Sequence, residues 1–167
     1  MKRAGIALGS NIGDRLSHLI TARAMISDLP LVLSPILASP VYETAPVDCE
    51  PGTESFLNAV VEIEYSGDAR TLLCEMRNIE SVLGRSPVHP RNTSRIIDLD
   101  LLYYGEIAIK TQDLEVPHPR MHERRFVLQP LSDIRPDLAL PSQQVTVGKL
   151  LQQLSDTSSV VRSSAQW

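Results

Sequence analysis

Two aspartates inside an otherwise apolar run are the strongest chemical signal in this sequence. The run is Ile96-Ile97-Asp98-Leu99-Asp100-Leu101-Leu102, which predicts a strand. Because side chains alternate along a strand, Asp98 and Asp100 should share one face, about 7 Å apart. Like charges this close repel unless they are solvated or neutralised, and oxygen ligands without a His or Cys cluster favour Mg²⁺. The alternative is a half-solvated strand whose acids pair with arginines.

Arginines flank this acidic pair on both sides. Three precede it and three follow it: Arg85, Arg91 and Arg95, then Arg120, Arg124 and Arg125. Planar guanidinium groups suit phosphate oxygens, although any single one of them could belong to a solvated loop. Together with the acidic strand they predict a polyphosphate bound with a metal ion. The sequence has neither a Walker loop nor a Rossmann glycine fingerprint.

Two histidines, His118 and His122, have a spacing that could bind a metal ion from one helical face. Pro117 and Pro119 argue against a regular helix there. We therefore favour a histidine that contacts phosphate, or one that is merely exposed, over a zinc ligand.

The elements that would position these residues alternate between strand and helix. Apolar patterning predicts strands at 3–8, 56–65 and 96–104, an edge strand or two short pieces at 32–44, and short strands near 107–109 and 114–116. Helices are predicted at 14–28, 69–83 and 146–154. Turn residues predict exposed loops at 48–54 and 117–125, the latter with at most one helical turn, and we expect a frayed tail after Ser155. This order predicts an α+β sandwich with helices on one face of a mainly antiparallel sheet. We expect a single domain over residues 1–154 and a polar tail over 155–167.

The net charge, the length of the apolar stretches and the number of cysteines argue against several classes of protein. The 167 residues carry a formal net charge of -4, so neither nucleic acid nor a membrane is an expected partner. No apolar stretch approaches the ~18 residues of a spanning helix, and the N-terminus lacks a signal-peptide pattern. The two cysteines suggest no disulfide scaffold; Cys74 is expected to pack in the core and Cys49 to lie in an exposed loop. We expect a cytoplasmic protein.

Six segments, taken together, are similar to one enzyme family. They are Leu8–Asp14, Tyr42–Pro46, Phe56–Ala59, Ile79–Glu80 with Gly84–Arg85, Arg95–Asp100 and Val116–Met121. The chain resembles, from about Ile6 to Leu131, the 6-hydroxymethyl-7,8-dihydropterin pyrophosphokinases of folate biosynthesis. The resemblance implies a ferredoxin-like α+β fold.

The resemblance also implies the chemistry, which is transfer of pyrophosphate from MgATP to the hydroxymethyl group of the reduced pterin, leaving AMP. Asp98 and Asp100 would hold two Mg²⁺ ions, and Arg85 and Arg95 would act with them as catalytic residues that stabilise phosphate charge.

Further binding residues follow from the same resemblance. ATP would contact Glu80, Arg85, Arg95, His118 and Arg124. The pterin would contact Thr44, Ala45, Pro46, Phe56, Asn58 and Phe126, where an amide reads the pterin edge and aromatic rings stack on its face. Other enzymes of the folate pathway are expected functional partners.

Two departures from the family pattern stand out. Many relatives carry an Arg-Trp-Gly-Pro-Arg run where this chain has Arg91-Asn92-Thr93-Ser94-Arg95, so the tryptophan that would cover the pterin is replaced by Asn92. Pro119 stands where the family often has an aromatic residue. The altered loop leaves open a degenerate pterin-binding or nucleotide-binding module. Another Mg²⁺-dependent nucleotidyl or phosphoryl transferase is a second alternative, because an acidic pair with arginines would serve any polyphosphate.

Overall fold

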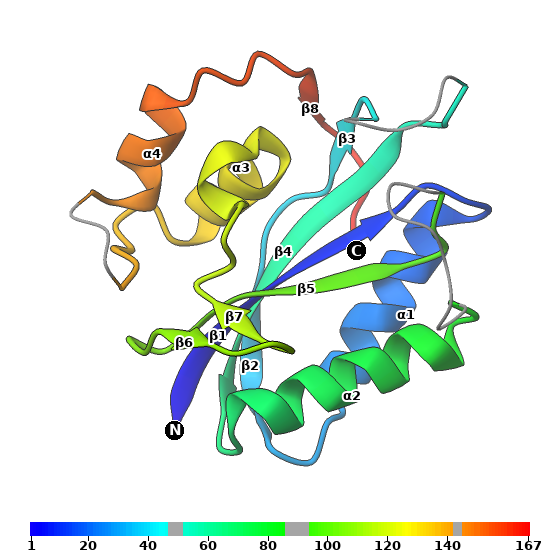
Figure 1. Cartoon of the computed structure of the whole chain (residues 1–167). Helices are drawn as coiled ribbons and strands as arrows, with labels where there is room; N and C mark the ends of the chain where they lie inside the picture. The colour runs from blue at the N-terminus through cyan, green and yellow to red at the C-terminus, as the bar shows by residue number, and fades with distance from the viewer. Residues whose placement is uncertain (47–51, 86–93, 142–144) are drawn as a thin grey trace.

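The centre of the molecule is an antiparallel sheet. The computed structural model describes residues 1–46, 52–85, 94–141 and 145–167 (Figure 1). The strands of this sheet are β1 (Lys2–Ser10), β2 (Val32–Ala38), β3 (Tyr42–Thr44), β4 (Phe56–Tyr65), β5 (Asp98–Tyr104) and β8 (Val160–Arg162). Their order is β5-β1-β4-β3-β8, and β2 pairs with the C-terminal half of β4. The predicted strands and the two short pieces within 32–44 are confirmed.

Two helices cover one face of this sheet. They are α1 (Arg15–Ser27) and α2 (Ala69–Val82), and both begin at an aspartate that caps the first turn. Asp14 accepts a hydrogen bond from the Ser17 amide at 3.1 Å, and Asp68 accepts one from the Thr71 amide at 2.8 Å. Their apolar faces form the main core with alternate residues of the strands. Both helices were predicted from their apolar periodicity.

The other face carries α3 (Arg125–Ile134) and α4 (Val147–Gln153), which build a second core (Figure 1). Val60 belongs to this second core, whereas its neighbour Val61 belongs to the main one. The expectation of helices on one face only is therefore wrong, because β4 is apolar on both faces and each face needs cover. The α+β class with a mainly antiparallel sheet is confirmed.

A small hairpin and a short helical turn connect β5 to α3. The hairpin consists of β6 (Ile109–Lys110) and β7 (Glu115–Val116), and the turn is the 3₁₀ helix η1 (Met121–Glu123). The first of these strands lies two residues later than predicted. The single helical turn expected within 117–125 is confirmed.

The C-terminal residues are ordered against the sheet. Strand β8 pairs with β3, and the Trp167 indole N–H donates to the Ser39 carbonyl at 2.8 Å. The Arg23 guanidinium lies over the Trp167 ring, 5.1 Å from its centroid. The expectation of a frayed tail is wrong, because hydrogen bonds and the indole contact offset the entropy cost of ordering this polar segment. The division at residue 154 stays a prediction.

Of the two cysteines, only Cys74 lies among the described residues. Cys74 is exposed on α2, so the expectation that it packs in the core is wrong. Leu72 and Met76 form the buried stripe of this helix, and a residue two positions after Leu72 points away from that stripe. Cys49 and most of the predicted loop at 48–54 lie outside the described residues.

Glu62 anchors α3 to the sheet from the second face. Only 5% of its side chain is exposed; it accepts a hydrogen bond from the Tyr103 hydroxyl at 2.6 Å and one from Arg135 Nε at 2.8 Å. Replacing Glu62 with alanine leaves both donors without their partner, and we expect the free energy of unfolding to fall by about 3 kcal/mol. Urea denaturation monitored by circular dichroism measures this loss.

The matched control is Glu64→Ala on the same strand. Glu64 is 46% exposed and its carboxylate lies 3.7 Å from Arg3 Nε, so its removal should cost less than about 1 kcal/mol. Equal losses in the two variants would contradict the anchoring role of Glu62.

Candidate active site

The acidic pair lies on the face of β5 that α3 and α4 share. Asp98 and Asp100 alternate along the strand with Leu99 and Leu101, which are buried in the main core. Their cross-strand partners are Gly9 and Ala7 on β1. The structure thus places both carboxylates on one face of the strand, as alternation predicts.

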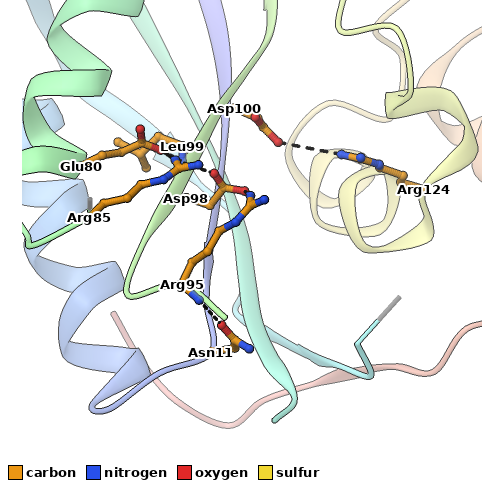
Figure 2. Close-up of polar contacts among 8 residues, drawn as sticks. All are labelled: Asn11, Glu80, Arg85, Arg95, Asp98, Leu99, Asp100 and Arg124. Atoms are coloured by element: carbon orange, nitrogen blue, oxygen red, sulfur yellow. Dashed lines mark hydrogen bonds and ion pairs between the residues drawn. The ribbon is translucent and has the colours of Figure 1, made fainter. Parts of the chain in front are cut away.

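Two arginines neutralise Asp98 (Figure 2). Arg85 Nη1 lies 2.7 Å from Asp98 Oδ1, and Arg95 Nη1 donates to Asp98 Oδ2. Arg85 follows α2 and Arg95 precedes β5, so the aspartate lies between the two ends of one connection. Arg95 Nε is buried and has no hydrogen-bond partner among the described residues. An N–H in this position is available to an anionic ligand.

Asp100 is much less compensated than Asp98. Its nearest cation is Arg124, whose Nη1 lies 3.9 Å from Oδ2, and 41% of the aspartate side chain is exposed. Loss of hydration raises the pKa of the Asp100 carboxyl, and the neighbouring Asp98 charge raises it further. A bound cation would relieve this repulsion.

The donor set fits Mg²⁺ better than zinc. No group of three or more His, Cys, Asp or Glu side chains gathers in the described part of the chain to hold a metal ion unaided. Mg²⁺ commonly uses one or two carboxylates and completes its shell with water and phosphate oxygens. Asp98 and Asp100 offer that pair, so the residues present fit a Mg²⁺ that arrives with a polyphosphate.

Glu80 connects α2 to the edge of β5. Its carboxylate accepts a hydrogen bond from the Leu99 amide at 2.7 Å and another from the Arg85 guanidinium. Burial raises the pKa of Glu80 to about 7, against the opposing effects of the Leu99 N–H and of Arg85. Leu99 is the residue between the two aspartates, so Glu80 connects α2 to the middle of the acidic pair. Its geometry supports a role in holding Arg85 beside Asp98.

The start of α3 supplies Arg124 and Phe126. The guanidinium of Arg124 lies over the Phe126 ring, 5.5 Å from its centroid. The same group faces Asp100 (Figure 2). No side chain within α3 caps its first turn; instead the Asp156 carboxylate accepts from the Arg125 amide at 3.0 Å. Arg125 Nε also donates to the Asp156 carbonyl, so this arginine serves the helix rather than the acidic pair.

His118 is held as a neutral hydrogen-bond donor. Its amide donates to the Leu102 carbonyl at 2.8 Å, and its Nδ1 accepts from the Arg120 amide at 3.2 Å. With Nδ1 acting as an acceptor, the proton of the neutral ring is on Nε2. His122 Nε2 lies 3.6 Å from a Glu123 carboxylate oxygen, and the two histidines form no metal site among the described residues.

We expect the His118 ring to stay neutral at pH values at which an ordinary histidine is protonated. Burial, followed by the charges of Arg124 and Arg120, lowers the pKa of His118 to about 4. The ¹⁵N shifts of its ring should therefore show neutral imidazole at pH 5.5, in a long-range ¹H–¹⁵N correlation assigned with a His118→Gln variant. A non-hydrolysable ATP analogue should raise this pKa, because the triphosphate brings negative charge. A midpoint near 6.5 without nucleotide would contradict the prediction.

Three of the residues expected around the pterin, Thr44, Phe56 and Asn58, meet where β3 pairs with β4. Asn58 Nδ2 donates to Thr44 Oγ1 at 2.7 Å, and both side chains are buried. Phe56 pairs with Thr44 across the strands. Ala45 is exposed and Pro46 half-buried at the end of β3, while Phe126 approaches from α3 and packs on the second core.

Gly9 joins this group to the acidic pair. It lies opposite Asn58 on β4 and opposite Asp98 on β5, so the three residues form one row across three strands. A Cβ atom on Gly9 would come within 2.9 Å of the Asn58 Oδ1 atom. Only glycine leaves the amide and the space above the sheet unobstructed.

Sequence reasoning did not assign roles to Gly9 or to Asn11. Gly9 is the penultimate residue of β1 and Asn11 follows the strand; a glycine and two small polar residues at the end of an apolar run were the available signal. The positions of Arg91 and Asn92, including the missing tryptophan, lie outside the described residues.

Comparisons with known proteins relate the chain to one enzyme family. The family model for 7,8-dihydro-6-hydroxymethylpterin-pyrophosphokinase (HPPK) matches residues 5–136. The chain is 45% identical over 131 residues to the 2-amino-4-hydroxy-6-hydroxymethyldihydropteridine pyrophosphokinase of Bacillus subtilis, covering 78% of this chain and 77% of that protein.

Longer proteins match as well. The folic acid synthesis protein FOL1 of Dictyostelium discoideum is 35% identical over 145 residues, which cover 87% of this chain and 21% of that protein. This chain thus spans about a fifth of that relative. A crystal structure of an HPPK-DHPS protein in complex with substrates superposes with a TM-score of 0.71 at 13% identity, covering 91% of this chain and 45% of that one. The likeness confirms the ferredoxin-like α+β fold.

Proposed function

Because this chain belongs to the 7,8-dihydro-6-hydroxymethylpterin-pyrophosphokinase family, we propose that it transfers pyrophosphate from ATP to the hydroxymethyl group of 6-hydroxymethyl-7,8-dihydropterin. The hydroxymethyl oxygen attacks the β-phosphorus, the bond from that phosphorus to the α-phosphate oxygen breaks, and AMP leaves as the hydroxyl proton is lost. The observation that carries the proposal is the row Asn58, Gly9 and Asp98, which supports a pterin seated beside the acidic pair.

The acidic pair would hold two Mg²⁺ ions in this reaction. When bound, Mg²⁺ neutralises phosphate charge and orients the attacking oxygen against the β-phosphorus. Asp98 is already paired with Arg85 and Arg95, so a cation at Asp98 would compete with both guanidinium groups. Arg85 and Arg95 would then be free to contact phosphate oxygens, to which Arg95 Nε, without an acceptor among the described residues, could donate.

Arg124 and His118 would complete the nucleotide side. Arg124 reaches toward Asp100 from α3, and the neutral His118 offers an Nε2–H donor that costs little to desolvate. Glu80 would act on ATP through Arg85, which it contacts.

The pterin side would use an amide and two aromatic rings. The Asn58 Nδ2 donates to Thr44, which fixes the amide so that Oδ1 faces Gly9 and can accept from the pterin edge. Phe56 and Phe126 supply flat apolar surface for the ring. Ala45 and Pro46 line the approach with their backbone.

The test mixes purified protein with MgATP and the dihydropterin and quantifies AMP and pterin diphosphate. We expect equal amounts of both products, none with EDTA, and almost none with Asp98→Ala. Pterin binding without turnover would favour a degenerate binding module. ATP consumption with another acceptor, and none with the pterin, would favour a different Mg²⁺-dependent transferase.

We also propose that the protein works in the cytoplasm beside other folate enzymes. Within the described residues, no helix is both long and apolar enough to cross a membrane. The matching relatives include a folic acid synthesis protein and a joined HPPK-DHPS protein, which supports a functional association with that pathway.

A further inference from the structure

One buried amide joins three segments that are far apart in the sequence. Asn11 is 1% exposed, in the turn that follows β1. The side-chain Oδ1 accepts a hydrogen bond from the Arg95 backbone amide at 2.6 Å (Figure 2), and the backbone N–H of Asn11 donates to the Arg95 carbonyl at 3.0 Å. The backbone of Arg95 is therefore fixed at both its N–H and its C=O.

The side-chain nitrogen of Asn11 contacts both the segment before β5 and the segment before β4. Asn11 Nδ2 donates to Ser94 Oγ at 3.2 Å and to the Glu54 carbonyl at 3.4 Å. Glu54 lies two residues before Phe56 and four before Asn58. Both groups of this amide are thus engaged: Oδ1 contacts the phosphate side, and Nδ2 connects that side to the pterin side.

The residue that Asn11 holds in place, Arg95, belongs to the proposed catalytic site. Arg95 reaches Asp98 with Nη1, and its buried Nε has no partner among the described residues, which points to a ligand oxygen as the missing acceptor. A guanidinium can serve an in-line displacement only if its backbone is held in place, because a misplacement of about 1 Å can cost about 10²-fold in rate.

We propose that Asn11 is a positioning residue for pyrophosphoryl transfer, acting through Arg95 and fixing its distance from the pterin side of the site. This inference rests on the proposed function. Asn11 does not touch the reacting atoms; it determines where the Arg95 guanidinium lies when they react.

The experiment compares Asn11→Ala with a matched structural control, Ser39→Ala. Ser39 is also buried, and its hydroxyl accepts from the Val60 amide at 3.0 Å, away from the acidic pair. We expect similar losses of thermal stability in both variants, because each loses buried hydrogen bonds to the backbone. Only Asn11→Ala should lose kcat, by about 10²-fold, with the KM for the pterin changed much less.

A double variant tests whether the effect passes through Arg95. If Asn11 acts by placing Arg95, then Asn11→Ala combined with Arg95→Ala should be no slower than Arg95→Ala alone. Multiplicative losses in the double variant, or a kcat for Asn11→Ala within threefold of the wild type, would overturn the inference while leaving the proposed function intact. Absence of AMP with the wild-type protein would instead refute the proposed function, and the inference with it.

Discussion

Replacing Asp100 with asparagine is expected to remove about 10³-fold or more of kcat while leaving the fold at least as stable as the wild type. The two effects have one cause. Surrounding protein atoms remove part of the hydration of the Asp100 carboxylate although 41% of the side chain is exposed, and this loss and the Asp98 charge raise its pKa, so the ionised form at neutral pH costs free energy in the folded state. Asparagine removes that cost together with the ligand for Mg²⁺, whose charge would otherwise offset it.

The measurements are kcat at saturating Mg²⁺ and the midpoint of thermal unfolding. Asp113→Asn is the control, because Asp113 is an exposed acid in the turn before β7. It should change neither quantity by much. A kcat for Asp100→Asn within tenfold of the wild type, or a clear fall in its melting temperature, would contradict a ligand role for this residue.

Glu80 should make the free energy of unfolding fall as the pH rises, and the Glu80→Gln variant should lack this contribution. Its folded pKa of about 7 lies above its ordinary value of 4.5, so the folded state binds the proton more tightly than the unfolded state. Its contribution is fully present below about pH 4.5 and is lost as the pH rises through 7. Between these limits the unfolding free energy of the wild type should fall by about 3 kcal/mol relative to Glu80→Gln.

Urea titrations of both proteins at intervals between pH 4.5 and 8 test this difference. Glu75→Gln, on the same helix, controls for the loss of one acidic side chain. A gap between wild type and Glu80→Gln that is constant across this range would show that Glu80 does not take up a proton on folding there.

Local patterns were sufficient for strands β1 to β5 and for the first helical layer. Strand β4 is rich in β-branched residues, β5 is apolar around its two aspartates, and α2 shows a regular apolar stripe ending at Gly84. The acidic pair was predictable for the same reason, since alternation along a strand depends only on neighbours in the sequence. The binding roles of the remaining residues stay predictions that rest on the resemblance.

Helix α3 and strand β8 escaped local reasoning, whereas α4 was predicted at 146–154. Helix α3 contains Pro130, which usually ends a helix, although Val127, Leu128 and Leu131 form a buried stripe on either side of it. Strand β8 is a three-residue segment in polar surroundings and is fixed by pairing with β3, more than a hundred residues earlier. Asn11 was missed because its three partners come from segments that only the tertiary structure brings together.

The capping of α3 by Asp156 links the position of Arg124 to the segment that follows α4. The helix that presents Arg124 takes its first-turn acceptor from a residue 31 positions further along the chain. An N–H at the start of a helix that loses its acceptor is left unsatisfied, so the first turn loses stability. A disturbance of the segment after α4 is therefore expected to reach the acidic pair through Arg124, although Asp156 itself contacts Arg125 and not the aspartates.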